Sequence, residues 1–440
     1  MEEWHDRRLH FVGVGGCGMS GLALVARSLG ATVSGSDCAD QPVLARLRAA
    51  GVSTYVGHAA DQVPAGTELI HSTAILPDNP ERQRAEELGL PVRRRGELLA
   101  ELARLRRTIA VAGSHGKTTT AAMTLTALRG AGIPAGYIIG ADLLDTGVNA
   151  DWGSGDWLVV EADESDRSLL ALSTEVAVLT NVELEHVRIY RSWEDVAEVF
   201  REFLAQAEHN IIWDRPELLA LSARPDPRRF DAPHPRLTPQ GSRFKWREHE
   251  VSLRVPGEHN ARNAAAALEA SQLAGAAPDR AVAALAGFGG TARRLERLGR
   301  TASGAEVYDD YAHHPTEVSA TLAAARTLGP SRLVAVFEPH SFQRTRLMAD
   351  EFGRALTLAD ESLVLDVLRA GPLDVEPVSS EVVVQAARSA GARAVSAVSG
   401  HPAAEQWLRA RLRPGDLCVT MGNLHIDELA HRLCEPAVRI

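Results

Sequence analysis

Residues 107–130 read RTIAVAGSHGKTTTAAMTLTALRG. An apolar strand pattern comes first, a glycine turn follows it, and a helical pattern begins at His115. At such a strand–loop–helix junction the backbone N–H groups of the turn can surround the β and γ phosphates of a nucleotide. Lys117 adds a positive charge, and the Thr118 hydroxyl is suited to magnesium. The segment therefore predicts a nucleoside triphosphate site, and a chance glycine–lysine turn is the alternative.

A run of acidic residues follows the next apolar strand. WLVV, residues 157–160, leads directly into EADESD, residues 161–166. Magnesium ligands in open α/β folds lie at the carboxyl ends of parallel strands, which is where Glu161 falls. A solvated acidic turn is the common alternative for such a run, but its place after the phosphate loop favours a metal site. Thr118 and Glu161 are therefore predicted to hold Mg²⁺.

A second glycine-rich turn occurs near the start of the chain. LHFVGVGGCGMSG, residues 9–21, is typical of a strand, a G-x-G-x-x-G turn and the start of a helix. Asp37 ends the next strand, at the position from which an acidic residue binds a ribose in dinucleotide folds. The turn predicts a nucleotide diphosphate ligand, and it does not distinguish NAD from a UDP-sugar. The predicted ligand residues are Gly13, Gly15, Gly16, Gly18, Met19, Ser20 and Asp37.

Strand and helix patterns alternate along the whole chain, which indicates an α/β protein with parallel, doubly wound sheets. The alternation restarts twice, so we predict three domains, at residues 1–106, 107–293 and 294–440. Residues 223–241 contain five prolines. Because proline cannot donate a backbone hydrogen bond, we expect these residues to form a surface loop without regular structure, within the middle domain.

The composition indicates a cytoplasmic protein that does not bind nucleic acid. The formal net charge of −10 lacks the basic field of a general nucleic-acid binder. The four cysteines have no metal-ligand spacing, and no apolar run approaches the ~20 residues of a membrane span. The charged N-terminus leaves no room for a signal peptide. We interpret the basic run Arg93–Arg95 as the solvated start of a helix.

Seven segments occur in the order in which a known family has them. They are GVGGCGMSG, STAILPDNPE, GSHGKTTT, EADESD, GEHNARNAAAA, DDYAHHPTE and EPHSFQRT, within residues 11–346. On these segments the chain resembles the Mur ligases. DDYAHHPTE and EPHSFQRT are most similar to the alanine-adding members of that family, rather than to those that add glutamate, a diamino acid or a dipeptide.

The resemblance implies a Rossmann-like N-terminal domain for a UDP-sugar, a central P-loop-type ATPase domain, and a Rossmann-like C-terminal domain that closes over ATP and binds the amino acid. It also implies an ATP-dependent ligase of peptidoglycan precursor synthesis. The lactyl carboxylate of UDP-N-acetylmuramate would attack the γ-phosphate of ATP, and the amine of L-alanine would then displace phosphate from the acyl phosphate. ATP and Mg²⁺ are the implied cofactors, and the enzyme would be a monomer or homodimer.

Several site residues are implied by the resemblance alone. His186 resembles a ligand of a second magnesium ion, Arg294 an arginine that approaches the phosphates, and Asp309 a ribose or hinge contact. Arg344 is suited by its planar fork to a carboxylate. Lys117, His186, Arg294 and Arg344 form the implied catalytic set. The implied ATP-binding residues are Gly113, Ser114, His115, Gly116, Lys117, Thr118, Thr119, His259, Asn260, Asn263, Arg294 and Asp309; the amino-acid pocket is His313, His314, His340 and Arg344; Ser72 and Thr73 join the UDP-sugar residues; and the metal ligands are Thr118, Glu161 and His186.

The sequence departs from the family pattern at two places. Glu185-His186-Val187-Arg188 stands where the family usually has Asp-His-x-Asp, and residues 420–425 replace a Gly-Ala-Gly-Asp turn. Two alternatives within the family therefore stay open: a recycling ligase that attaches a whole peptide to the same sugar, and a paralogue that binds both nucleotides without ligation. An NAD-dependent oxidoreductase is the alternative from another class, but it leaves the second phosphate loop unexplained.

Overall fold

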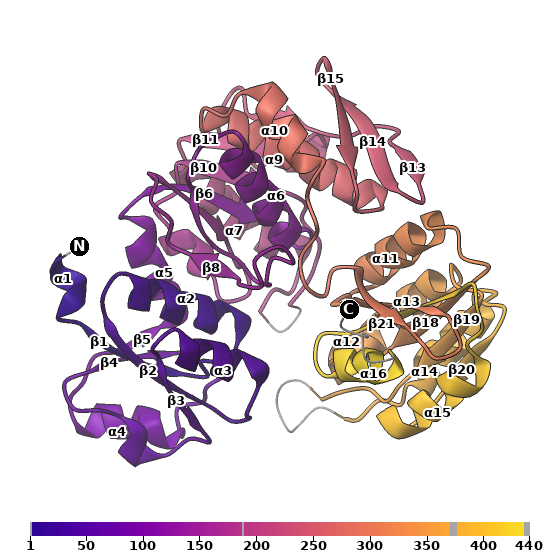
Figure 1. Cartoon of the computed structure of the whole chain (residues 1–440), viewed down its shortest axis with the longest axis horizontal. Coiled ribbons are helices and arrows are strands. Elements are labelled where there is room, and N and C mark those ends of the chain that lie inside the picture. The colour runs from indigo at the N-terminus through magenta and orange to yellow at the C-terminus, as the bar shows by residue number, and fades with distance from the viewer. Residues whose placement is uncertain (1, 187–188, 370–375, 435–440) are drawn as a thin grey trace. The chain divides into compact units, whose positions relative to one another are not determined.

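A computed structural model of the chain describes residues 2–186, 189–369 and 376–434 (Figure 1). The chain divides into two compact units. The first consists of Met1–Asp231 with Arg262–Phe288, and the second of Ala232–Ala261 with Gly289–Ile440. The first unit contains two sheets, each of which carries a glycine-rich loop.

The first sheet has five parallel strands in the order β3-β2-β1-β4-β5. The order in which successive strands are added reverses between β1 and β4, although the two strands are parallel. Open α/β sheets bind their ligands at the carboxyl ends of the strands at such a switch point. The glycine-rich turn after β1 lies there. The strands are β1 Arg8–Val12, β2 Thr32–Asp37, β3 Ser53–Val56, β4 Glu68–His71 and β5 Val92–Arg94, and the helices are α1 Glu2–His5, α2 Cys17–Ser28, α3 Pro42–Ala49, α4 Pro80–Glu87 and α5 Arg95–Ala103.

The second sheet has seven strands in the order β12-β11-β10-β6-β9-β7-β8, and only β8 pairs antiparallel. Its central strand β6 lies between β10 and β9, so the segments that follow these three strands meet at one edge. The strands are β6 Arg107–Ala112, β7 Gly136–Ile138, β8 Ala150–Asp151, β9 Trp157–Glu161, β10 Val176–Leu179, β11 His209–Trp213 and β12 Arg228–Phe230; the helices are α6 Lys117–Gly130, α7 Trp193–Gln206, α8 Pro216–Leu219, α9 Glu258–Leu273 and α10 Pro278–Leu285.

The second unit contains a six-stranded sheet, β16-β17-β21-β18-β19-β20, and a three-stranded antiparallel one, β13-β14-β15. Alternate residues of β18 serve the two faces of the larger sheet, Phe337 in one apolar core and Val336 in the other. The strands are β13 Arg236–Thr238, β14 Gly241–Trp246, β15 His249–Leu253, β16 Glu296–Arg300, β17 Glu306–Asp310, β18 Arg332–Phe337, β19 Glu361–Val364, β20 Val395–Ala397 and β21 Asp416–Met421; the helices are α11 Pro315–Thr327, α12 Phe342–Leu347, α13 Ala349–Leu356, α14 Glu381–Ser389, α15 His401–Arg411 and α16 Ile426–Leu433.

The predicted α/β class with parallel, doubly wound sheets is confirmed. The prediction that residues 223–241 lack regular structure is wrong, because β12 and β13 lie within them. Neither strand contains a proline. Pairing with β11 gives the short stretch of β12 between two prolines its strand conformation. Residues Ala232–Ala261, which include the second half of this segment, belong to the second compact unit. Among the described residues, no helix is both long and apolar enough to cross a membrane.

Candidate functional site

The phosphate loop Gly113–Gly116 lies between the end of β6 and the start of α6. Gly113 and Gly116 have φ values of +132° and +80°, which residues with a side chain rarely adopt. Asn181, just beyond β10, supports the loop from the next strand. Its Oδ1 accepts a hydrogen bond from the His115 N–H at 2.8 Å, and its Nδ2 donates to the His115 carbonyl at 2.9 Å. These two contacts with Asn181 hold the loop in shape.

Lys117 points back into this loop. Its Nζ donates to the Gly113 carbonyl at 2.6 Å and to Glu164 Oε2 at 2.9 Å. Burial acts to lower the pKa of Lys117, but the negative charges of Glu164, Asp163 and Glu161 outweigh it, and the pKa is raised. Lys117 is therefore a fixed positive charge beside the predicted phosphate loop.

Thr118 and Glu161, the predicted magnesium ligands, are in contact. The Thr118 hydroxyl donates to Glu161 Oε2 at 2.8 Å, and the Gly140 N–H donates to the same oxygen at 2.8 Å. A hydroxyl and a carboxylate beside a phosphate loop form the oxygen donor set that Mg²⁺ takes, so these residues fit the ion. Thr119, the next residue of α6, is buried.

His186 lies beside the same acidic segment. One ligand atom each from Glu164, Glu185 and His186 falls within 4.8 Å of the others. The φ of His186 is +52°, a strained value for a residue with a side chain. Burial acts to lower the pKa of His186, but the hydrogen bond to Glu164 and the charge of Glu185 raise it overall. Arg188, at which the sequence departs from the family pattern, lies outside the described residues.

The first glycine turn is held by Asp37. The Gly15 N–H donates to Asp37 Oδ2 at 2.8 Å in a buried hydrogen bond. A Cβ added to Gly15 would lie 2.8 Å from that oxygen, so the contact requires glycine. The second oxygen, Oδ1, accepts weaker bonds from the Ala39 N–H at 3.4 Å and the Gln41 side chain at 3.5 Å. Asp37 thus shapes the loop as well as facing a predicted ribose position.

The other predicted sugar-nucleotide residues differ in their placement. Ser72 lies against Gly13, 3.4 Å from a Cβ built there, and Thr73 beside it is exposed. Met19 and Ser20 are buried, and the backbone N–H groups of both donate to the carbonyl of Gly16, the residue that caps α2. Gly18 lies in the first turn of α2, where a Cβ built on it would lie 2.8 Å from Nη1 of Arg95, the first residue of α5. A diphosphate would therefore meet the glycine backbone rather than the Met19 side chain.

Asp309 and Arg294 lie at the start of the larger sheet of the second unit. Burial raises the pKa of Asp309, although Arg293 Nε, 2.9 Å from Oδ2, and the Thr420 hydroxyl, 2.6 Å from Oδ1, both donate to its carboxylate. Arg293 has a φ of +58°. Arg294 lies over the Tyr311 ring, 5.1 Å from its centroid. Asp309 thus fixes the backbone that carries Arg294.

The predicted amino-acid pocket is partly assembled within the second unit. His340 Nδ1 accepts a hydrogen bond from Asn423 Nδ2 at 3.1 Å. Burial and the neighbouring charges of His313 and Arg344 lower the pKa of His340 to about 4. Ser341, which caps the helix that carries Arg344, has a φ of +77°. His313, His340 and Arg344 are therefore close together, whereas His314 is buried as the cap of α11.

The three residues predicted to reach the adenine share the first turns of α9. Asn260 Nδ2 donates to the Pro256 carbonyl at 2.7 Å, and His259 packs against Gly257. Asn263 belongs to the first unit and touches the phosphate loop, because a Cβ added to Gly116 would lie 2.8 Å from its Oδ1. Asn263 therefore contacts the predicted ATP loop directly.

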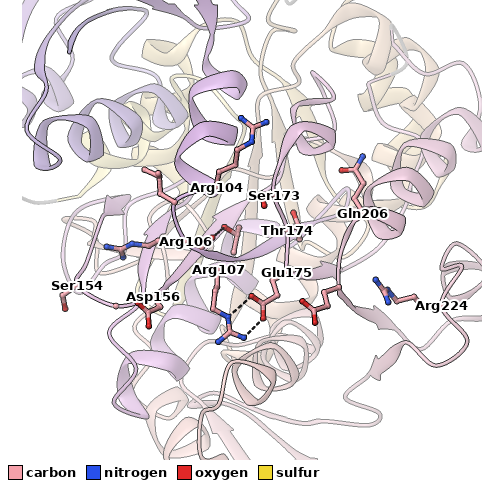
Figure 2. A pocket seen from close by; sticks show the side chains of 14 residues that line it. Arg104, Arg106, Arg107, Ser154, Asp156, Ser173, Thr174, Glu175, Gln206 and Arg224 are labelled. Atoms are coloured by element: carbon pink, nitrogen blue, oxygen red, sulfur yellow. Dashed lines mark hydrogen bonds and ion pairs between the residues drawn. The ribbon is translucent and has the colours of Figure 1, made fainter. Parts of the chain in front are cut away.

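A cavity of about 970 Å³ lies elsewhere in the first unit (Figure 2). It is lined at the opposite edge of the second sheet, where β6, β9 and β10 begin, by Arg107, Asp156 and Glu175 among others. Figure 2 shows Arg107 and Glu175 paired across it. Open α/β sheets bind ligands at the carboxyl ends of their strands, so this cavity is not the candidate site.

Three residues of the site were missed from the sequence. Glu164 pairs with Lys117, and Asn181 supports the phosphate loop. Asn149, the residue before β8, donates a hydrogen bond from Nδ2 to the carbonyl of Cys17 of the first glycine turn. The acidic run was recognised, but its sequence contains four carboxylates and does not say which one faces Lys117. Asn149 carries no motif that would reveal it.

Three sequence-family models match the chain. They are "Mur ligase family, catalytic domain" over residues 8–107, "Mur ligase middle domain" over residues 111–271, and "Mur ligase, glutamate ligase domain" over residues 293–424. Curated relatives include the UDP-N-acetylmuramate–L-alanine ligases of Azorhizobium caulinodans, 38% identical over 97% of this chain and 96% of that protein, and of Gloeobacter violaceus, 40% identical over 98% and 97%.

Solved structures similar to this chain include two ligases. The UDP-N-acetylmuramate–alanine ligase of Thermotoga maritima has a TM-score of 0.84 at 26% identity, with 97% of this chain and 98% of that chain covered. A murein peptide ligase from Psychrobacter arcticus has a TM-score of 0.74 at 25% identity, with the same coverage. The fold is therefore more similar to the alanine ligase than to the peptide ligase.

Proposed function

Since this chain belongs to the Mur ligase family, we propose that it joins L-alanine to the lactyl carboxylate of UDP-N-acetylmuramate, with conversion of ATP to ADP and phosphate. The observation that carries the proposal is the contact of Thr118 with Glu161 beside a loop that holds Lys117. The identity of 37–40% to curated alanine-adding ligases supports the choice of substrates. The reaction would take place in the cytoplasm, where ATP is available.

The first step forms a bond between two anions. A lactyl carboxylate oxygen attacks the γ-phosphorus of ATP, the bond to the β-γ bridging oxygen breaks, and ADP leaves with that electron pair. Like charges approach each other, so catalysis depends on positioning and on fixed positive charge. Lys117 supplies that charge, and the loop of residues 113–116, which Asn181 holds in shape, would position the phosphates. Mg²⁺ held by Thr118 and Glu161 would neutralise charge on the phosphate oxygens.

The second step forms the amide. The neutral amine of L-alanine attacks the acyl carbon, the bond to the phosphate oxygen breaks, and phosphate leaves as the nitrogen loses a proton. We assign the carboxylate of L-alanine to Arg344, whose fork suits it, and the wall of the pocket to His313, His314 and His340. His340 with its lowered pKa is neutral near pH 7, so it adds no positive charge beside the amine of L-alanine.

The remaining roles complete the proposal. Gly13, Gly15, Gly16, Gly18, Ser72 and Asp37 would bind the UDP moiety, and His259, Asn260 and Asn263 the adenine. Arg294 would approach the phosphates, and His186 with Glu164 and Glu185 would hold a second Mg²⁺ ion close to the attacking carboxylate. Mg²⁺ takes an octahedral set of ligands and usually keeps several waters. These three side chains would leave positions on the ion for such waters.

Phosphate release tests the substrate choice. The enzyme is supplied with ATP, Mg²⁺ and UDP-N-acetylmuramate, and each amino acid is added in turn, followed by the murein tripeptide. We expect release that depends on both the sugar nucleotide and L-alanine. Release with the peptide but with no single amino acid would instead identify the recycling ligase, and binding of both nucleotides without release under any condition would identify the inactive paralogue.

A further inference from the structure

Arg95 lies at the junction of the two domains that form the first unit. It is the first residue of α5, directly after β5 of the first sheet. Its guanidinium reaches the acidic segment after β9 of the second sheet, with Nη2 2.5 Å from Asp163 Oδ2 and 3.1 Å from Asp166 Oδ2. The side chain is 21% exposed. The prediction that the basic run Arg93–Arg95 is a solvated helix start is therefore wrong for Arg95.

The same guanidinium touches the first glycine turn. A Cβ added to Gly18 would lie 2.8 Å from Arg95 Nη1, so the absence of a side chain there lets the two groups meet. Helix α5 is held closely in this position, because a Cβ added to Gly96 would lie 2.4 Å from the Ser168 Cβ. Arg95 therefore contacts the turn proposed for the sugar nucleotide and the segment proposed for magnesium at once.

Charge connects this contact to the ATP loop. Burial acts to raise the pKa of Asp163, but the positive charges of Arg95 and Lys117 lower it well below its ordinary range. Asp163 is in turn one of the groups that raise the pKa of Lys117. The carboxylate that Arg95 holds thus lies in the electrostatic field of the lysine that faces the γ-phosphate.

We propose that Arg95 is a positioning residue that fixes the sugar-nucleotide turn relative to the ATP loop. The proposal rests on the function proposed above. Arg95 Nη1 lies against Gly18 and Nη2 pairs with Asp163 and Asp166, so one planar fork sets the distance between the turn that would bind the sugar nucleotide and the acidic segment beside the ATP loop. A displacement of about 1 Å between reacting groups costs as much as 10²-fold in rate, and Arg95 prevents that displacement.

The test compares Arg95→Gln and Arg95→Lys with a matched control, Arg46→Gln. Arg46 joins the same two domains through Asp142, with Nη1 2.7 Å from Oδ2, but it contacts neither glycine loop among the described residues. We expect Arg95→Gln to lower kcat for phosphate release about 10- to 100-fold while KM for ATP changes less than about twofold. Arg95→Lys keeps the charge without the fork, so its kcat should fall between those of the wild type and Arg95→Gln.

Thermal unfolding separates positioning from a purely structural contact. Arg95→Gln and Arg46→Gln should lower Tm by similar amounts, and only Arg95→Gln should lower kcat. An unchanged kcat in Arg95→Gln, or an equal loss in Arg46→Gln, would overturn the proposal. If the wild type releases no phosphate, the proposed function fails, and Arg95 is tested by calorimetry instead: Kd for UDP-N-acetylmuramate should depend on a bound non-hydrolysable ATP analogue in the wild type and Arg46→Gln, but not in Arg95→Gln. Equal dependence in all three proteins would overturn it.

Discussion

The ammonium group of Lys117 lies 2.9 Å from Oε2 of the buried Glu164. Removal of the Lys117 charge would leave the buried Glu164 with His186 as its remaining cationic partner among the described residues. Lys117 is also one of only two lysines in the chain, the other being the exposed Lys245 of β14. The chain thus contains its own control for experiments on the catalytic charge.

Lys117→Ala should abolish turnover and leave the sugar nucleotide bound. Without the lysine charge, attack of a carboxylate on the triphosphate loses its main fixed cation, and we expect phosphate release to fall by about 10³-fold or more. The Kd for UDP-N-acetylmuramate, measured by calorimetry, should stay within about twofold because that ligand is assigned to the other glycine turn. Lys245→Ala should match the wild type in both measurements. Loss of both properties in Lys117→Ala would contradict the assignment of the two loops.

Glu161→Gln should raise the concentration of Mg²⁺ that the enzyme needs. The substitution keeps the shape of the side chain but replaces one carboxylate oxygen, and loss of an anionic ligand weakens an Mg²⁺ site. A magnesium titration of phosphate release should show the midpoint moved at least about tenfold upward, in line with the cost of a disturbed metal ligand set. Glu175→Gln, at the opposite edge of the same sheet, serves as the control and should leave the midpoint unchanged. An unshifted midpoint in Glu161→Gln would remove this residue from the metal site.

Gly116→Ala should weaken ATP binding because the added methyl group would collide with Asn263, in addition to straining the backbone. Gly116 has a φ of +80°, and an added Cβ would lie 2.8 Å from Asn263 Oδ1. Gly147, at a φ of +69°, has nothing within 4 Å of such a Cβ. Both alanine variants should therefore lose about 1 kcal/mol or more of unfolding free energy. Only Gly116→Ala should raise the Kd for ATP in a calorimetric titration; equal Kd values in the two variants would show that the contact with Asn263 does not matter.

His340 should remain uncharged down to acidic pH. Its pKa is lowered from 6.5 to about 4, so the unfolded chain takes up this proton at a higher pH than the folded chain does. The stability that the neutral ring contributes is complete above pH 6.5 and is lost as the pH falls through about 4. An NMR titration of the histidine rings, with His340→Gln to identify the resonance, should give a midpoint near the lower value. A midpoint near 6.5 would place the ring in water.

The contact between Thr118 and Glu161 could be predicted from the sequence, because both residues lie at the carboxyl ends of neighbouring parallel strands. Thr118 follows β6 and Glu161 ends β9, and adjacent parallel strands place their carboxyl ends side by side. The partner of Lys117 could not be predicted, because the turn of residues 161–166 decides which carboxylate faces inward. The basic run predicts a solvated Arg95, yet this residue follows a strand of the first sheet and pairs with Asp163 after a strand of the second, a long-range contact that no local pattern encodes.

The strands in the proline-rich segment were missed for a related reason. Local propensity correctly excluded the prolines themselves, but Arg228–Phe230 gains its strand conformation by pairing with Ile211–Trp213 of β11. Tertiary pairing thus overrides local preference. The same holds for β3 and β5, short strands whose positions depend on the sheet that they extend.

The most direct test of the proposed reaction follows an oxygen atom. UDP-N-acetylmuramate is prepared with ¹⁸O in both oxygens of its lactyl carboxylate and is incubated with the enzyme, ATP, Mg²⁺ and L-alanine, and the phosphate and the nucleotide product are analysed by mass spectrometry. Our account predicts that one ¹⁸O appears in the phosphate and that the other stays in the new alanyl amide, because the carboxylate attacks phosphorus before the amine attacks carbon. Unlabelled phosphate, or phosphate released without an alanyl product, would contradict it.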